Sequence, residues 1–108
     1  MGDFDGEGGS KMTITRIYRV QIKPELRDEF EPLFKTVALS SVKDAPGCQN
    51  AQLGGPTSKT PNEYSVTSIW DNEESLKSFV GSDWTKAHIP AGMERFVDQC
   101  WVHHYTEM

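Results

Sequence analysis

The sequence predicts a single α+β domain, in which four strands and two helices follow the order strand, helix, strand, strand, helix, strand. Three stretches carry this prediction. Thr13 to Ile22 and Glu63 to Trp70 alternate with a period of two residues, and apolar residues between Pro24 and Val42 recur at helical spacing. Right-handed crossovers then place both helices on one face of an antiparallel sheet and leave the other face bare.

The first strand and first helix occupy the N-terminal part of this order. The face of Thr13 to Ile22 that is predicted to meet the helices carries Ile14, Arg16, Tyr18, Val20 and Ile22. The helix begins at Pro24, a residue suited to a first turn, and ends at Ala45-Pro46-Gly47. Pro32 lies inside this helix, and its missing N–H predicts a kink.

A short second strand, Cys48 to Leu53, leads through a turn-rich loop to the third strand, Glu63 to Trp70. The face of the third strand that is predicted to be buried carries Tyr64, Val66, Ser68 and Trp70. Asp71 or Asn72 then caps the second helix.

Beyond the second helix the expected order is less regular. Gly81 and Ser82 predict an interruption, after which Ser82 or Asp83 caps a second short helix. The last strand is Gln99 to Thr106. Adjacent strand residues point to opposite faces, so His103 and His104 are not expected to form a metal site.

Composition limits the classes of function. The chain has 108 residues and a net charge of −5, so it lacks the broad cationic field that would attract nucleic acid. No hydrophobic run approaches the length of a membrane span, and the two cysteines form no CxxC motif. We therefore expect a cytoplasmic protein that binds neither nucleic acid nor membrane. Residues 1–11 are expected to be a disordered leader or a cloning remnant before a domain over residues 12–108.

The stretch from Trp70 to His88 predicts a pocket, because a strand ends there and a helix lined with aromatic rings begins. Trp70, Phe79 and Trp84 are the residues expected to hold an aromatic ligand.

These features resemble the antibiotic biosynthesis monooxygenase-like family over about residues 13–106. The matching segments are Ala45-Pro46-Gly47 before the second strand, Trp70 at the end of the third, Asp71-Asn-Glu-Glu-Ser-Leu76 at the start of the second helix, and Ser82-Asp-Trp-Thr-Lys-Ala-His88. The resemblance implies a ferredoxin-like subunit whose bare sheet face pairs with a second copy, giving a homodimeric α+β barrel. Each subunit would keep its own pocket between the sheet and the helices.

The resemblance also implies a cofactor-independent monooxygenase that acts on small aromatic, quinol-like or polyketide-like compounds, with no cofactor and no metal. In this scheme His88 is the base, Arg16 stabilises an enolate or phenolate, and Tyr18 orients the substrate by a hydrogen bond. Haem degradation, a known activity in the superfamily, is not expected, since Tyr18 and Phe79 replace the Asn and Trp that the haem-degrading branch carries.

Each candidate residue also has a structural interpretation. His88 could serve as a helix-end histidine, and the three rings could fill the core or an interface. Arg16 could lie at the sheet edge with its guanidinium in solvent. The alternative function is therefore a dimeric barrel that binds a small molecule without turning it over, or an orphan dimer. Cys48 and Cys100, on the second and fourth strands, are expected to be buried free thiols.

Overall fold

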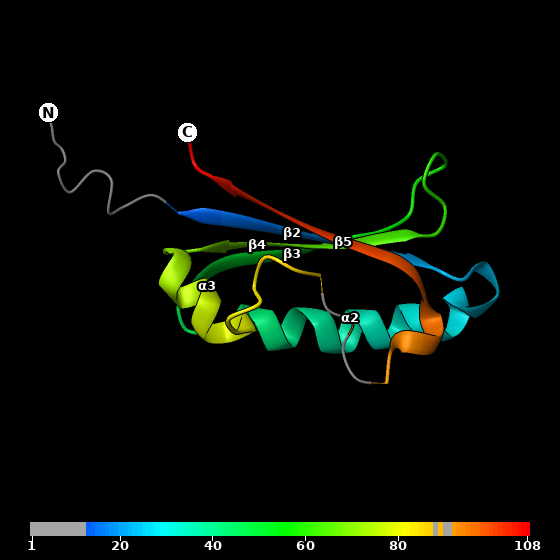
Figure 1. The fold of residues 1–108 in the computed structure, drawn as a ribbon. Coiled ribbons are helices and arrows are strands. Elements are labelled where there is room, and N and C mark those ends of the chain that lie inside the picture. The colour runs from blue at the N-terminus through cyan, green and yellow to red at the C-terminus, as the bar shows by residue number, and fades with distance from the viewer. Residues whose placement is uncertain (1–12, 88, 90–91) are drawn as a thin grey trace, which may run out of the picture.

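The structure is a computed structural model that describes residues 13–87, 89 and 92–108 (Figure 1). Its strands are β2 (Ile14–Ile22), β3 (Cys48–Gly54), β4 (Glu63–Trp70) and β5 (Val97–Thr106), and its helices are α2 (Arg27–Lys43) and α3 (Glu73–Val80). Two 3₁₀ turns, η1 (Pro24–Leu26) and η2 (Glu94–Phe96), precede α2 and β5. The domain assigned to residues 12–108 stays a prediction, and residues 1–11 lie outside the description.

The four strands form one sheet in the order β3-β4-β2-β5, and every pairing is antiparallel. The predicted α+β fold is thus confirmed as a ferredoxin-like arrangement. β3 and β5 form the two edges, and they carry Cys48 and Cys100 as free thiols, each partly buried.

Both helices cover one face of the sheet, as Figure 1 shows below the strands, and the described residues leave the opposite face bare. The burial pattern along β4 identifies the residues on the covered face. Tyr64, Val66, Ser68 and Trp70 alternate as buried residues with partly exposed neighbours, which matches the predicted period of two.

The start of α3 follows the expected capping chemistry. Asn72 is the N-cap, and its side-chain oxygen accepts a hydrogen bond from the Ser75 backbone N–H at 2.9 Å. Gly81 ends the helix with φ of 111°, a backbone conformation that glycine adopts without a steric penalty.

Two boundaries differ from the sequence-based expectation. The predicted single helix from Pro24 is a 3₁₀ turn followed by α2, which continues through Pro32. The predicted second short helix after Gly81 is wrong for the described residues, because residues 82–85 form a turn in which the Lys86 N–H bonds to the Asp83 carbonyl at 3.0 Å.

Buried residues form two separate clusters between the sheet and the helices. The larger consists of Val20, Ile22, Phe30, Phe34, Tyr64, Val66 and Phe96, and the smaller of Ile14, Trp70 and Leu76. In the larger cluster, the ring of Phe30 lies 5.0 Å from that of Tyr64 and 5.6 Å from that of Phe96. The core is therefore packed with aromatic rings in one cluster and centred on Trp70 in the other.

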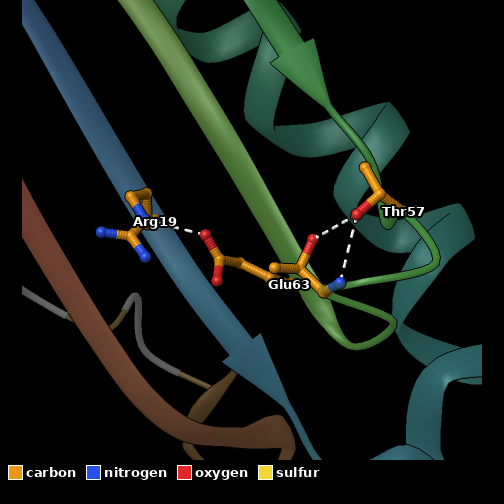
Figure 2. Close-up of polar contacts among 4 residues, drawn as sticks. Arg19, Thr57 and Glu63 are labelled. Atoms are coloured by element: carbon orange, nitrogen blue, oxygen red, sulfur yellow. Dashed lines mark hydrogen bonds and ion pairs between the residues drawn. The ribbon is translucent and has the colours of Figure 1, made fainter.

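The bare face of the sheet carries mixed side chains. Arg19 on β2 binds Glu63 on β4 at 2.8 Å across the two strands, as Figure 2 shows, and its guanidinium also lies 4.9 Å from the centre of the Trp101 ring on β5. Ile17, Ile69 and Trp101 are partly exposed on this face, and Tyr105 is 56% exposed. Apolar surface of this kind is available to a partner.

Candidate functional site

A cavity of about 340 Å³ lies between the sheet and the two helices. Both core clusters contribute to its wall, the larger through residues such as Phe30 and Phe34 and the smaller through Trp70. Protein interiors are normally packed with few voids larger than a water molecule. A space of this size, walled by members of both clusters, has the dimensions of a ligand pocket.

The lining is almost entirely apolar. Its apolar members are Val20, Phe30, Leu33, Phe34, Val37, Ala38, Val42, Val66, Trp70, Phe79, Val80, Met93 and Val97. The polar members are Arg16, Tyr18 and Ser68. A few polar groups within apolar walls are typical of sites that orient a small molecule.

Exposed apolar residues mark the mouth of the cavity. Leu33 and Val37 on α2 and Phe79 on α3 line it, yet they are 43%, 57% and 41% exposed. Large apolar side chains left in solvent beside a cavity extend the surface available to an apolar ligand. Solvent therefore reaches three of the side chains that line the cavity, two on α2 and one on α3.

Arg16 is the one cation among the described residues that line the cavity. Its Nη1 donates to the Trp84 carbonyl oxygen at 2.8 Å and also contacts His104 Nε2 at 3.1 Å. Because a guanidinium carries only donors, His104 Nε2 accepts this bond, so the imidazole is neutral with its proton on Nδ1. Burial lowers the pKa of the Arg16 guanidinium from its ordinary value, with the neighbouring Tyr18 acting in the opposite direction.

His104 was not predicted as a site residue. Its pKa is lowered, first by burial and then by the positive charge of Arg16 and by His103. Its ring also meets the Trp84 ring edge-on, with centroids 4.8 Å apart. A sequence signal did exist, because His104 shares a strand face with Cys100, and pairing of the first and last strands places it opposite Arg16.

Tyr18 provides the second polar side chain of the wall. Burial, followed by the neighbouring Cys100 thiol, raises the pKa of its hydroxyl to about 12. Tyr18 therefore stays protonated at neutral pH and acts as a hydrogen-bonding group rather than as a base.

Trp70 and Phe79 line the cavity, as their prediction as substrate-binding residues requires. Trp70 is fully buried, its Nε1 donates to Ser68 Oγ at 2.9 Å, and its ring lies 5.1 Å from that of Phe79. The indole N–H is thus already bonded within the protein. Trp70 forms a fixed wall, and Phe79 is the ring that remains partly open to solvent.

The two other predicted residues are placed differently. Trp84 does not line the cavity but holds Arg16 through its carbonyl oxygen. His88 lies outside the described residues, so its position as the candidate base stays a prediction. Among the described residues that line the cavity, none is a carboxylate or an imidazole.

The described residues contain no group of three or more His, Cys, Asp or Glu side chains arranged to bind a metal ion. They also contain no helix with the length and apolar character needed to cross a membrane.

The fold and the cavity place this chain in the class of ferredoxin-like α+β proteins that have a pocket between the sheet and the helices. Residues 13–91 match the family model described as antibiotic biosynthesis monooxygenase, and the chain belongs to this family. No protein with a curated description matches the chain.

Solved structures share the fold at low sequence identity. A conserved protein from Methanosarcina mazei Go1 is 24% identical, with a TM-score of 0.68 over 89% of this chain and 93% of its own. A candidate antibiotic biosynthesis monooxygenase from Caulobacter crescentus CB15 is 21% identical, with a TM-score of 0.68 over 91% and 92% of the two chains. A second such candidate, from Bordetella bronchiseptica, is 20% identical, with a TM-score of 0.62 over 89% and 97%. At these identities the likeness extends to the fold alone.

Proposed function

We propose that the protein is a cofactor-independent monooxygenase that oxidises a small aromatic, quinol-like or polyketide-like compound in the cavity between sheet and helices. The observation that carries the proposal is an apolar cavity of ligand size with Arg16 and Tyr18 in its wall, in a member of this family. The volume of about 340 Å³ suits a ligand of two or three fused rings.

The proposed reaction needs no bound cofactor because the substrate supplies the electrons. A phenol or quinol with a free carbon ortho or para to a hydroxyl group loses the proton of that hydroxyl, and the resulting anion forms a carbon–oxygen bond with O₂ at the free carbon. Protonation gives a hydroperoxide. Loss of the ring proton and cleavage of the O–O bond then release water and leave a quinone, so one oxygen atom enters the product and the other becomes water.

The described residues supply parts of this scheme. The Arg16 guanidinium stabilises the oxyanion that forms, and the Tyr18 hydroxyl, which also hydrogen-bonds to Cys100, orients the substrate. The proton-accepting role falls to His88, which the sequence places after the ring-lined helix. Apolar walls remove water from the reacting anion, which strengthens each of these interactions.

A second function, binding without turnover, has one observation in its favour. No described residue of the cavity wall has a pKa suited to a general base, since Tyr18 titrates at about 12 and Arg16 is a permanent cation at neutral pH. A protein that only binds would use the same cavity and leave its ligand unchanged.

Oxygen consumption separates the two functions. Wild-type protein is mixed with a panel of phenols and naphthoquinols, with catalase present, and oxygen uptake is compared with a protein-free control. With ¹⁸O₂, the monooxygenase is expected to give a quinone that carries one labelled oxygen atom. Saturable binding of the panel without uptake above the control would favour the binder instead.

We also propose that the bare sheet face pairs with a second copy of the chain. The support comes from the apolar side chains of Ile17, Ile69, Trp101 and Tyr105 on that face. A stable dimer of this kind buries about 1,200 Å² or more in total. In a dimer with a two-fold axis, the same surface of each copy contacts that surface of the other, so one apolar face is enough to form the interface.

Light scattering at micromolar concentration is expected to give about twice the chain mass of 12.2 kDa. Ile69→Asp places a charge on the bare face, opposite the uncharged Thr15 and Asn50, and should shift the mass toward the monomer, because an unpaired charge is costly to bury. Val37→Asp, on an exposed position of α2, is the matched control and should leave the dimer intact. A wild-type protein with the mass of one chain would refute the pairing.

A further inference from the structure

We propose that the cavity selects a monoanionic ligand, with an apolar body between the helices and an anionic oxygen bound to the Arg16 guanidinium. The inference rests on the proposed function in so far as the cavity is the substrate site. It adds the substrate class, namely carboxylates, phenolates or enolates that bind as the anion.

The first argument is the charge of the cavity wall. Among the described residues of the wall, Arg16 is the only cation, and none of them is a carboxylate that could balance it. The ion pairs of the described residues do not include Arg16, and its two hydrogen-bonding partners, the Trp84 carbonyl and His104, are uncharged acceptors. A half-buried cation without a counterion favours a ligand that brings one.

The second argument is the geometry of the guanidinium. Both hydrogen bonds that Arg16 makes to described residues leave from Nη1. The N–H groups of Nη2 and Nε make no hydrogen bond to a described residue. These two nitrogens form one of the two forks through which arginine binds a carboxylate with parallel bonds.

The third argument is that neighbouring residues hold Arg16 in position. The Trp84 carbonyl and the His104 imidazole fix one end of the guanidinium, and the contact between the Trp84 and His104 rings braces the two acceptors against each other. A side chain fixed before binding loses less conformational entropy when the ligand arrives. The lowered pKa of His104 supports this arrangement, because a neutral imidazole is needed to accept the bond.

The remaining wall determines the rest of the ligand. Phe79, Leu33 and Val37 are apolar at the mouth, and Trp70 closes the wall with its N–H already bonded to Ser68. The Tyr18 hydroxyl stays protonated and contributes no negative charge that would repel an anion. The ligand therefore combines one anionic group with an apolar, ring-sized body.

The test compares 2-naphthoate with 2-naphthamide, a neutral molecule of nearly the same shape, by titration calorimetry at neutral pH. Wild-type protein is expected to bind the carboxylate about tenfold or more tightly than the amide, because hydrogen bonds to a charged partner are the stronger kind. Arg16→Gln should remove this preference while retaining binding of the amide. Arg16→Lys, which keeps the charge but loses the fork, should retain part of it.

Arg19→Gln is the matched control. Arg19 lies three positions along the same strand but on the bare face, where it binds Glu63, so the variant loses the same charge without touching the cavity. It should keep the preference of the wild type. Equal affinity of wild-type protein for the two probes, no saturable binding of 2-naphthoate, or a preference that survives in a folded Arg16→Gln protein would overturn the proposal.

The outcome is separable from that of the proposed function. If 2-naphthoate binds with this preference and no phenol or naphthoquinol consumes oxygen, the anion site stands and the oxygenase does not. If anionic and neutral substrates are oxidised equally well, the oxygenase stands and the anion site is refuted.

Discussion

Trp70→Ala is expected to lower the free energy of unfolding by about 3–5 kcal/mol, the largest effect on stability that we predict for one substitution. The side chain is fully buried, packs against the Phe79 ring, and bonds to Ser68 through Nε1. Alanine leaves a void in the smaller core cluster and orphans the Ser68 hydroxyl, which is itself 2% exposed. Urea unfolding monitored by circular dichroism measures the loss.

Phe79→Ala is the matched comparison. Phe79 lines the same cavity as Trp70 and its ring contacts the Trp70 ring, but Phe79 is 41% exposed. Phe79→Ala should lower the free energy of unfolding by less than Trp70→Ala does, because the Phe79 side chain buries less apolar area in the folded protein. Equal losses for the two variants, or a loss below about 1 kcal/mol for Trp70→Ala, would contradict the assignment of Trp70 to the core.

His88→Ala is expected to slow oxygen uptake by about 10² or more with a responsive naphthoquinol, the lower end of general-base effects. The prediction rests on the sequence and the family resemblance, since His88 lies outside the described residues. Turnover per folded protein is measured together with the melting temperature. A lower melting temperature with unchanged turnover would instead indicate a structural histidine.

His103→Ala is the control for this experiment, because His103 is exposed on the bare face of β5 and lies away from the cavity wall. It should leave turnover unchanged. A comparable loss of turnover in His103→Ala would show that the effect of His88→Ala is not specific to the proposed base.

The sequence predicted the elements whose signals are local. Alternation with a period of two identified β4 and its buried face, and Asn72 was identified as a candidate helix cap from its position after Trp70. Four strands and two helices in this order then leave few topologies, because crossovers are right-handed. The sequence-based prediction failed after Gly81, where a short helix was expected and residues 82–85 form a turn. Ser and Asp are common both as helix caps and in turns, so residue type does not separate the two structures there.

The electrostatic part of the site could not be predicted in the same way. The contact between Arg16 and His104 joins residues 88 positions apart and depends on the register of β2 with β5. The other partner of Arg16 is the backbone carbonyl of Trp84, an atom that every residue has, so residue type gives no signal for it. Trp84 was predicted from its ring, whereas its carbonyl oxygen is the group that fixes the guanidinium.

The size of the cavity was also beyond sequence reasoning, since volume depends on how far two core clusters stay apart. Aromatic residues spaced along α2 and α3 predict an apolar interior but do not determine whether it fills completely. The structure assigns Phe30 and Phe34 to packing with Tyr64, and it leaves Phe79 partly open at the mouth.

A crystal structure of the protein grown with saturating 2-naphthoate tests most directly whether this cavity is the functional site. The account predicts density for the fused rings between the sheet and the two helices, with the carboxylate within hydrogen-bonding distance of the Arg16 guanidinium. Naphthoate bound on the bare sheet face, or a carboxylate that points through the mouth into solvent and away from Arg16, would contradict it.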